Sequence, residues 1–349
     1  MASPLVGLIT DGVDDNPRDH ESWSEPLLVL RLILMHAIGL LAIGMNVLNI
    51  AVLYKVQCFH DATKLFLRVL AVVDLSSGFL TLISENIQYW GNLKHGVSYF
   101  CEITYLGAIF LIISSLFLLS CLSLDRIIAV TKPLRYPTLM DKKRAALVAT
   151  AALSLACLLA IGLLSRKSPL DNVYYDAKYR FCSISGFDSD IQFALALGGS
   201  ISLIVIICTT AINIKLLFVA LKQSKRNRTI MIKPPSDTSH IVNNVGDRDK
   251  LPAVMNIQIS RWQEMKALRT VLTMTVAIYL AYLPLTMHAT RFAIGLTPHG
   301  MFYEFFAYVM IYCNAWFNPV IYLFSNKGYR KAAVKVLKQN WMVKYAMNL

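Results

Sequence analysis

Polar side chains that could do chemistry interrupt several long apolar runs of this chain. Asp74 stands ten residues after Lys64, and Ser115 stands ten residues before Asp125, so both lie about 15 Å along a helix from those charges. Oxygen donors around one carboxylate suit a small hard cation, or a proton with ordered water. The alternative is a water-filled packing network without ion specificity. The further donors at this depth are Asn46, Asn314 and Asn318.

A second group of charges lies at the end of the third apolar run. Asp125 and Arg126 follow Cys101 by about 25 residues, which is roughly 37 Å of helix and places them at the opposite membrane surface. Arg126 needs an acceptor, and the sequence offers both Asp125 and Glu264. Glu264 precedes Pro284 by twenty residues, so a pair with Arg126 would fasten the third run to the sixth. Breaking that pair would let the sixth helix swing about the kink at Pro284.

The seventh apolar run contains the dipeptide Asn318-Pro319. A proline inside a helix removes a hydrogen bond and clashes with the preceding turn, at a cost of about 3 kcal/mol. A lipid-embedded helix tolerates the proline where neighbouring helices or waters pair the carbonyl that it leaves open. The chain becomes basic shortly after Tyr322, from Lys327 onward, as expected where a helix leaves the membrane.

These side chains must be positioned by membrane-spanning helices. The chain is 56% hydrophobic and 16% charged, against roughly 45 to 50% and 25% for soluble domains. Its net charge of +13 does not predict a nucleic-acid partner, because the basic residues cluster between the apolar runs. About 20 apolar residues span a bilayer, and seven windows qualify. They lie near 27–54, 65–89, 99–131, 143–165, 190–222, 262–290 and 302–325.

The charges between the runs predict the orientation and the domains. Lysine and arginine dominate the connections after the first, third and fifth runs, so the positive-inside rule places the N-terminus outside and the C-terminus inside. We therefore expect an extracellular tail over 1–26, a seven-helix domain over 27–325 and a cytoplasmic segment over 326–349. The last begins with a short amphipathic helix at the inner leaflet. Within the bundle, residues 223–261 are predicted to form a flexible cytoplasmic loop.

Two cysteines lie on the outer side of the predicted bundle. Cys101 starts the third run, and Cys182 lies in the outer loop after the fourth. Both face the oxidising side of a plasma membrane, so the topology predicts a disulfide between them. This bond would hold the outer loop over the third helix.

In order and spacing, these motifs resemble those of the rhodopsin-like class of G-protein-coupled receptors. The resemblance implies an all-α membrane protein, a seven-transmembrane helix bundle with a short cytoplasmic helix after the seventh span. The chain would be a divergent receptor and not an enzyme, and it contains no HExxH metal motif, phosphate loop or nucleophile elbow. The motifs are Gly44-Met-Asn46, Leu70-Ala-Val-Val-Asp74-Leu75, Ser123-Leu-Asp125-Arg126-Ile127, Leu283-Pro284 and Asn318-Pro-Val-Ile-Tyr322.

The resemblance also implies roles for particular residues. Asp74, Ser115, Asn314 and Asn318, with Asn46 beside them, correspond to an allosteric sodium site, and no other cofactor is implied. Arg126 would release its ion pair and meet a heterotrimeric G protein. Receptor kinases and arrestin are further expected partners. The residues expected to switch on activation are Asp125, Arg126, Glu264, Tyr282, Pro284, Pro319 and Tyr322, with Tyr282 standing where the family usually has tryptophan.

The outer half of the sequence says mainly what the ligand is not. Receptors for biogenic amines resemble one another in an aspartate seven residues after the third-helix cysteine, and here that residue is Ala108. Opsins hold retinal through a lysine that is Tyr312 here. We expect neither a typical biogenic amine nor covalent retinal, and we interpret Arg31 as snorkelling to the membrane surface. Glu85 could bind a cation or pair with Arg291. Pocket candidates, for each of which plain packing is the alternative, are Glu85, Tyr105, Ala108, Ile109, Tyr282, His288, Arg291, Tyr308 and Tyr312.

Three functions remain open at this level. The first is a receptor that signals an extracellular ligand to G proteins by opening of the sixth helix. The second is a receptor-like decoy or chaperone without signalling, since Ile127 and Tyr282 depart from the usual switch residues. A seven-helix transporter is the third, and the lack of a repeat between the halves disfavours it.

Overall fold

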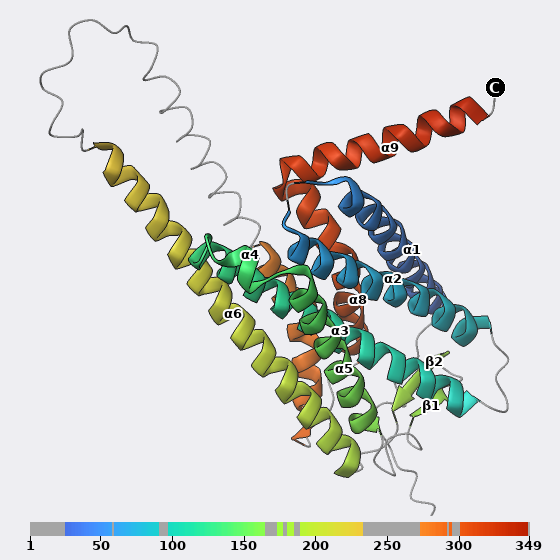
Figure 1. Ribbon diagram of the computed structural model, residues 1–349. Helices are drawn as coiled ribbons and strands as arrows, with labels where there is room; N and C mark the ends of the chain where they lie inside the picture. Colours follow the sequence, from blue (N-terminus) through green and yellow to red (C-terminus); the bar gives the residue numbers. More distant parts are fainter. Residues whose placement is uncertain are drawn as a thin grey trace, which may run out of the picture.

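The computed structural model describes most of the chain as helices (Figure 1). The described residues are 25–57, 59–90, 97–164, 173–176, 180–184, 189–232, 273–291, 293–294 and 301–347. The helices are α1 (Glu25–Lys55), α2 (Asp61–Trp90), α3 (Val97–Thr131), α4 (Tyr136–Leu139), α5 (Lys142–Leu164), α6 (Ser189–Ile232), α8 (Met301–Ser325) and α9 (Lys327–Met347). A further helix covers 273–291 and is called the Pro284 helix below. The strands are β1 (Val173–Asp176) and β2 (Phe181–Ile184).

Length and composition make five of the described helices able to cross a membrane, namely α1, α2, α3, α5 and α6. The Pro284 helix and α8 lie in the same bundle and correspond to the sixth and seventh predicted runs. The predicted fold class, an all-α seven-helix bundle, is thereby confirmed. α6 continues to Ile232, into the segment predicted as a loop, and residues 233–261 of that segment lie outside the described residues.

The sequence analysis did not predict the hairpin formed by β1 and β2. The two strands pair antiparallel, with Val173 opposite Ile184 and Asp176 opposite Phe181. Between them, Arg180 has a left-handed backbone with φ of 51°, a conformation that is uncommon for residues other than glycine. Its surroundings hold it there: its guanidinium donates to Glu25 at 3.0 Å, and its carbonyl accepts a bond from Arg31 at 2.9 Å.

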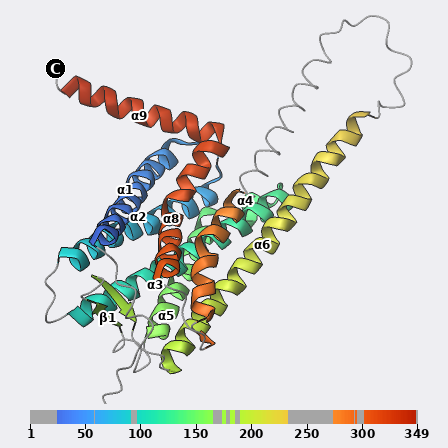
Figure 2. The ribbon, with the colours of Figure 1, turned by 180° about the vertical axis from the view of Figure 1, so that it is seen from behind.

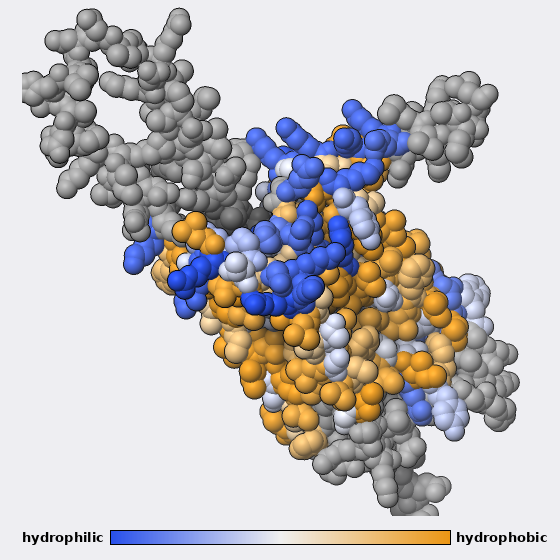
Figure 3. All heavy atoms as spheres, in the orientation of Figure 1, coloured by the Kyte–Doolittle hydropathy of each residue, from blue (hydrophilic) through white to orange (hydrophobic). Residues whose placement is uncertain are grey.

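The two ends of the bundle differ in character. α9 turns away from α8 at one end, here called the α9 end, and the hairpin lies at the opposite end, here called the hairpin end (Figures 1 and 2). Hydrophilic residues gather at the α9 end, and a broad hydrophobic surface covers the helices beyond it (Figure 3). Large apolar side chains of α1, α5 and α6, such as Leu40, Leu158 and Ile204, are exposed. Such a surface is unsuited to water and suits contact with lipid.

α9 packs against the bundle through one face, which begins with the buried side chain of Tyr329. The Tyr329 hydroxyl donates to Asn49 of α1 at 2.8 Å, and its ring lies 5.8 Å from that of Tyr322 in α8. Ala333 and Val336 follow on the same face and are also buried, at the spacing that puts side chains on one side of a helix. α9 thus has the predicted amphipathic character and extends to Met347.

α1 and α2 approach each other closely at two glycines. A Cβ atom at Gly78 would lie 3.0 Å from both the Gly39 carbonyl oxygen and the Ala42 Cβ atom, whereas a Cβ at Gly44 would meet nothing within 4 Å. Here a backbone carbonyl and a neighbouring Cβ cannot move aside as the end of a flexible side chain would. The absent side chain at Gly78 therefore sets the distance between the two helices.

We expect Gly78→Leu to lower the free energy of unfolding by about 3 kcal/mol, since overpacking forces backbone shifts. Gly44→Leu is the matched control and should leave it unchanged, because its site faces open space. Thermal unfolding of the purified chain in lipid nanodiscs measures both. Equal unfolding temperatures for the two variants would contradict this account of the α1–α2 contact.

Candidate functional site

A cavity of about 120 Å³ lies near the hairpin end of the bundle. α1, α2, α3 and α8 provide its walls, and Cys182 of β2 reaches it from the hairpin. Its apolar part includes Met35 and Phe305, and its polar part includes several hydroxyl groups. The lining residues are Arg31, Met35, Thr81, Ser84, Glu85, Gln88, Thr104, Tyr105, Ala108, Cys182, Phe305, Tyr308 and Tyr312.

An ion pair between α1 and α2 forms one wall of this cavity. Arg31 Nη2 lies 3.2 Å from Glu85 Oε2, and the two side chains are 6% and 11% exposed. The interpretation of Arg31 as a snorkelling residue is therefore wrong: the helix turns it inward, toward an acid at the same depth. Glu85 likewise pairs with Arg31, and not with Arg291 as one alternative held. The signal in the sequence was the occurrence of opposite charges near the outer ends of the first two runs.

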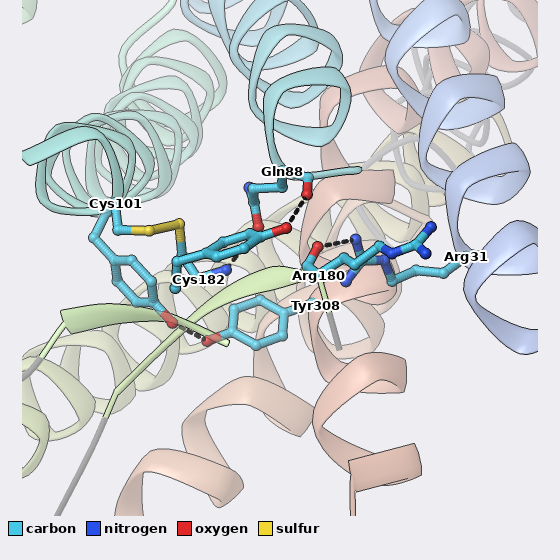
Figure 4. The surroundings of a disulfide bond; sticks show 8 residues. Arg31, Gln88, Cys101, Arg180, Cys182 and Tyr308 are labelled. Atoms are coloured by element: carbon cyan, nitrogen blue, oxygen red, sulfur yellow. Dashed lines mark hydrogen bonds between the residues drawn. A yellow bond between two sulfur atoms is a disulfide. The ribbon is translucent and has the colours of Figure 1, made fainter. Parts of the chain in front are cut away.

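The hairpin is fixed over this cavity by the predicted disulfide. Cys101 and Cys182 are bonded, with Cα atoms 5.5 Å apart, so this prediction is confirmed. Gln88 of α2 adds two contacts: its side-chain oxygen accepts the Cys182 N–H at 2.8 Å, and its carbonyl accepts the Tyr175 hydroxyl at 2.5 Å. Figure 4 shows Gln88 and Arg180 lying between the disulfide and Arg31. Among the described residues, one covalent bond to α3 and four hydrogen bonds to α1 and α2 thus hold the hairpin.

The structure brings together only some of the predicted pocket residues. Glu85, Tyr105, Ala108, Tyr308 and Tyr312 line the cavity, and the hydroxyls of Tyr105 and Tyr308 lie 3.3 Å apart (Figure 4). The other four lie elsewhere, because helix rotation places them on other faces. Ile109 packs near Ile113 and Ala156, and Tyr282 lies deeper. The His288 ring is tilted against the Tyr303 ring at 6.2 Å between centroids, and Arg291 is half-buried and not part of the lining.

Deeper in the bundle, hydrogen bonds join α2, α3 and α8 around Asp74. Ser115 donates to Asp74 Oδ1 at 3.2 Å, and Asn318 donates to Asp74 Oδ2 at 3.1 Å. Asn314 donates to the Ser115 hydroxyl at 3.0 Å and to the Tyr282 hydroxyl at 3.3 Å. Tyr282, standing where a tryptophan was expected, therefore connects the Pro284 helix to the residues around Asp74.

Asn46 was predicted to belong to the group around Asp74, but its amide donates to two backbone carbonyls instead. Its amide donates to the Ala315 carbonyl of α8 at 2.7 Å and to the Ala42 carbonyl at 2.8 Å. Ala315 is four residues before Pro319, so its carbonyl is the one that loses its helical partner at the proline. Asn46 thus supplies the missing donor from a neighbouring helix, as the sequence requires of some group. Its own Oδ1 atom is buried without a hydrogen-bond partner among the described residues.

At the α9 end, Asp125 is fully buried and receives two short hydrogen bonds. The Tyr136 hydroxyl of α4 donates to Oδ1 at 2.6 Å, and the Thr63 hydroxyl of α2 donates to Oδ2 at 2.7 Å. Arg126 Nε is 3.9 Å from the same carboxylate, and its guanidinium lies 5.6 Å from the Phe59 ring. The predicted partner Glu264 lies outside the described residues, and the sequence analysis missed both Tyr136 and Thr63.

The contribution of the Tyr136 hydroxyl can be tested by a variant that removes this group alone. Burial and the bond to Asp125 raise the pKa of Tyr136 to about 12, above an unfolded value of about 10. Its contribution to stability is therefore complete below about pH 10 and is lost only above it. We expect Tyr136→Phe to lower the free energy of unfolding by about 2 kcal/mol, the cost of losing a bond to a buried charged group.

The measurement is thermal unfolding of both proteins between pH 6 and pH 9, where the difference should stay constant. Tyr54→Phe is the control, since Tyr54 is 71% exposed. A difference that shrinks within this pH range, or one no larger than that of the control, would contradict the assignment.

In the described part of the chain, hydrogen bonds between side chains join α6 to its neighbours in the half of the bundle toward the α9 end. One links α3 to α6, and the other two link α6 to the Pro284 helix. The sequence analysis missed these polar residues. The pairs are Ser120–Thr209 at 2.7 Å, Thr210–Tyr279 at 3.1 Å and Asn213–Thr275 at 2.8 Å.

Comparison with known proteins agrees with this architecture. The alpha-1A adrenergic receptor of Cavia porcellus is 27% identical over 316 residues, which are 83% of this chain and 64% of that protein. The octopamine receptor Oamb of Drosophila melanogaster is 33% identical over 129 residues, which are 35% of this chain and 19% of that protein. The alpha-1A adrenergic receptor of Bos taurus is 25% identical over 339 residues, covering 90% of this chain and 69% of that protein.

The chain thus spans less than two thirds of the length of the first two relatives. The family profile described as 7 transmembrane receptor (rhodopsin family) matches residues 45–322, which is well over half of the chain. This segment includes Asn46, the residues around Asp74, the Asp125-Arg126 pair and Tyr322. The match and the helix bundle together establish that the chain belongs to the rhodopsin family of seven-transmembrane receptors, which are multi-pass membrane proteins.

Proposed function

We propose that the protein is a receptor that couples a ligand in the cavity to a heterotrimeric G protein at the α9 end. The observation that carries this proposal is the placement of residues along α8. Tyr312 lines the cavity, Asn314 and Asn318 bind the group around Asp74, and Tyr322 is buried near the α9 end. All three places lie along α8, so a small displacement of this helix reaches each of them.

Two groups at the α9 end support a second, active arrangement. The Tyr322 hydroxyl is buried without a hydrogen-bond partner among the described residues, and such a group costs free energy until another conformation pairs it. Arg126 has a loose contact of 3.9 Å with Asp125 and is 36% exposed. A ligand that favours the arrangement pairing Tyr322 and exposing Arg126 shifts the population toward it. In this proposal the Pro284 helix moves outward at the α9 end.

The proposal also fixes the orientation. The hairpin end, with its disulfide, faces outside, and the basic α9 end faces the cytoplasm, where the positive-inside rule puts lysine and arginine. Residues at this inner face would also meet receptor kinases and arrestin.

The test is G-protein activation in membranes of cells that express the full chain. Arg126→Ala should abolish ligand-stimulated nucleotide exchange, while Arg135→Ala, at an exposed position beside α4, should retain it. A chain that reaches the surface and activates no G protein under any ligand would support the alternative, a non-signalling decoy or chaperone. Ligand uptake into sealed vesicles would instead support a transporter.

The relatives are named as adrenergic and octopamine receptors, so a biogenic amine is the competing ligand. Ala108 lines the cavity where those receptors are expected to carry an aspartate, and the carboxylate that remains, Glu85, already pairs with Arg31 at 3.2 Å. We therefore retain the prediction that no typical amine is the ligand. Octopamine applied to the full chain should leave G-protein activation at its basal level, and a saturable response would contradict the prediction.

A sodium ion fits the residues around Asp74. The Asp74 carboxylate and the Ser115 hydroxyl are oxygen donors of the kind that bind hard cations. Asn46, which was predicted to belong to the same site, has a buried Oδ1 atom without a hydrogen-bond partner among the described residues. When bound, the ion would supply positive charge that steadies the inactive packing of α2, α3 and α8. The chain's own part is to hold these oxygens in place through Asn314 and Asn318.

We expect 150 mM sodium chloride, compared with potassium chloride, to lower basal G-protein activation and raise the unfolding temperature of the wild type. Asp74→Asn should remove both effects, because it removes the negative charge that binds the ion. A wild type indifferent to the choice of cation would contradict the sodium site.

A further inference from the structure

The cavity at the hairpin end is electrically neutral and contains charges of both signs. Among the described residues that line it, the charged side chains are Arg31 and Glu85, one of each sign, 3.2 Å apart. Both are almost entirely buried, so water screens them little. The remaining lining is hydroxyl, amide and apolar.

This neutrality selects among ligands by net charge. An amine that bound Glu85 alone would take that carboxylate from Arg31, and an acid that bound Arg31 alone would leave Glu85 uncompensated. Leaving one partner of a buried pair without its counter-charge is strongly unfavourable. A ligand that carries both charges gives each side chain a partner and keeps the cavity neutral.

The size of the cavity limits the ligand further. A cavity of about 150 Å³ holds a benzene molecule of six heavy atoms, and this one measures about 120 Å³. An α-amino acid carries its ammonium and carboxylate on one carbon atom, so its charges are close together. That arrangement matches two protein charges separated by 3.2 Å.

We propose that the cavity binds a small zwitterion of the α-amino acid type, with its ammonium on Glu85 and its carboxylate on Arg31. This rests on the proposed function, since it names the ligand class of the same cavity. The ligand would lie under the hairpin, because the Arg180 carbonyl also accepts a bond from Arg31 at 2.9 Å and Cys182 lines the same space. Binding would thus act directly on the contact that joins α1 to the hairpin.

Four matched small probes test the proposal on the full chain in lipid nanodiscs. Alanine is the zwitterion, propanoate lacks its ammonium, ethylamine lacks its carboxylate, and lactamide is uncharged with a similar shape. The readout is the dissociation constant from ligand-dependent thermal unfolding, which needs no G protein. We expect alanine to bind at least tenfold more tightly than each of the other three.

Charge variants give a second, reciprocal measurement. Glu85→Gln leaves Arg31 as the charged side chain, so propanoate should now bind at least tenfold more tightly than alanine. Arg31→Gln should transfer this preference to ethylamine. The double variant Arg31→Glu, Glu85→Arg keeps a neutral pair and should restore the preference for alanine, and it covers the case in which a single variant fails to fold.

Several results would overturn the proposal. They are a wild type that binds lactamide as well as alanine, one that prefers a singly charged probe, or one whose unfolding no probe changes at 100 mM. Other results would distinguish a failure of the ligand site from a failure of the proposed signalling function. Alanine binding without G-protein activation would remove the signalling and keep the site, and activation by another ligand without alanine binding would do the reverse.

Discussion

Asn46→Leu is expected to lower the free energy of unfolding by about 3 kcal/mol, with little change in side-chain volume. The lost group is the amide that donates to the Ala315 carbonyl at 2.7 Å, and Pro319 prevents α8 from supplying its own donor there. A buried carbonyl in a membrane-spanning helix has no water to replace that bond. The expected cost follows from leaving it unpaired.

Replacing the proline should restore the stability that Asn46→Leu loses. Pro319→Ala restores a backbone N–H that can bond the Ala315 carbonyl, so adding it to Asn46→Leu should recover most of the stability, with a coupling energy of about 2 kcal/mol. Asn49→Leu is the matched control, because this buried asparagine of the same helix accepts the Tyr329 hydroxyl instead. The stability lost in Asn49→Leu should be unaffected by Pro319→Ala. Additive effects of Asn46→Leu and Pro319→Ala in thermal unfolding would show that Asn46 has some other role.

Cys101→Ser is expected to lower the free energy of unfolding by about 4 kcal/mol, the loop-closure term for a bridge of this length, and to reduce delivery to the cell surface. The bond closes a loop with a sequence separation of 81 residues. It also fixes Cys182, which lines the cavity and bonds Gln88. Loss of the bridge should therefore weaken ligand binding as well as folding.

The design of this test uses the fact that a disulfide is one interaction between two residues. Cys182→Ser should match Cys101→Ser, and the double variant should cost no more than either single one. Cys157→Ser, at an exposed free cysteine of α5, is the control and should behave as the wild type. Surface labelling and thermal unfolding measure these effects, and normal values for Cys101→Ser would exclude a structural role for the bond.

Depth within the membrane was the property most readily predicted. Because each helical residue advances about 1.5 Å, spacing alone placed Asp74 level with Ser115, and the structure joins them by a hydrogen bond. The same argument put Cys101 and Cys182 on one side, where they are bonded. The first prediction needed only the distance of a residue from the end of its apolar run, and the second needed only the side of the membrane on which each connection lies.

The direction in which a side chain points was predicted poorly. Arg31 was expected at the membrane surface and is buried against Glu85. Ile109 and Arg291 were candidates for the pocket, with plain packing as the alternative, and are not among the residues that line the cavity. The spans are apolar on nearly all sides, so their periodicity does not mark the face that turns inward. The hairpin escaped prediction for a related reason, because its strands are only four residues long.

The sequence by itself determined that the chain is a membrane bundle, where each polar group lies along the membrane normal, and which two cysteines share a side. These properties depend on hydropathy and on position along a helix, which any single segment carries. Only the tertiary structure decided that Asn46 pairs the Ala315 carbonyl, that Tyr136 and Thr63 hold Asp125, and that Arg31 and Glu85 form the charged wall of the cavity. Those pairs depend on how each helix is rotated against its neighbours, and packing among all the helices sets that rotation.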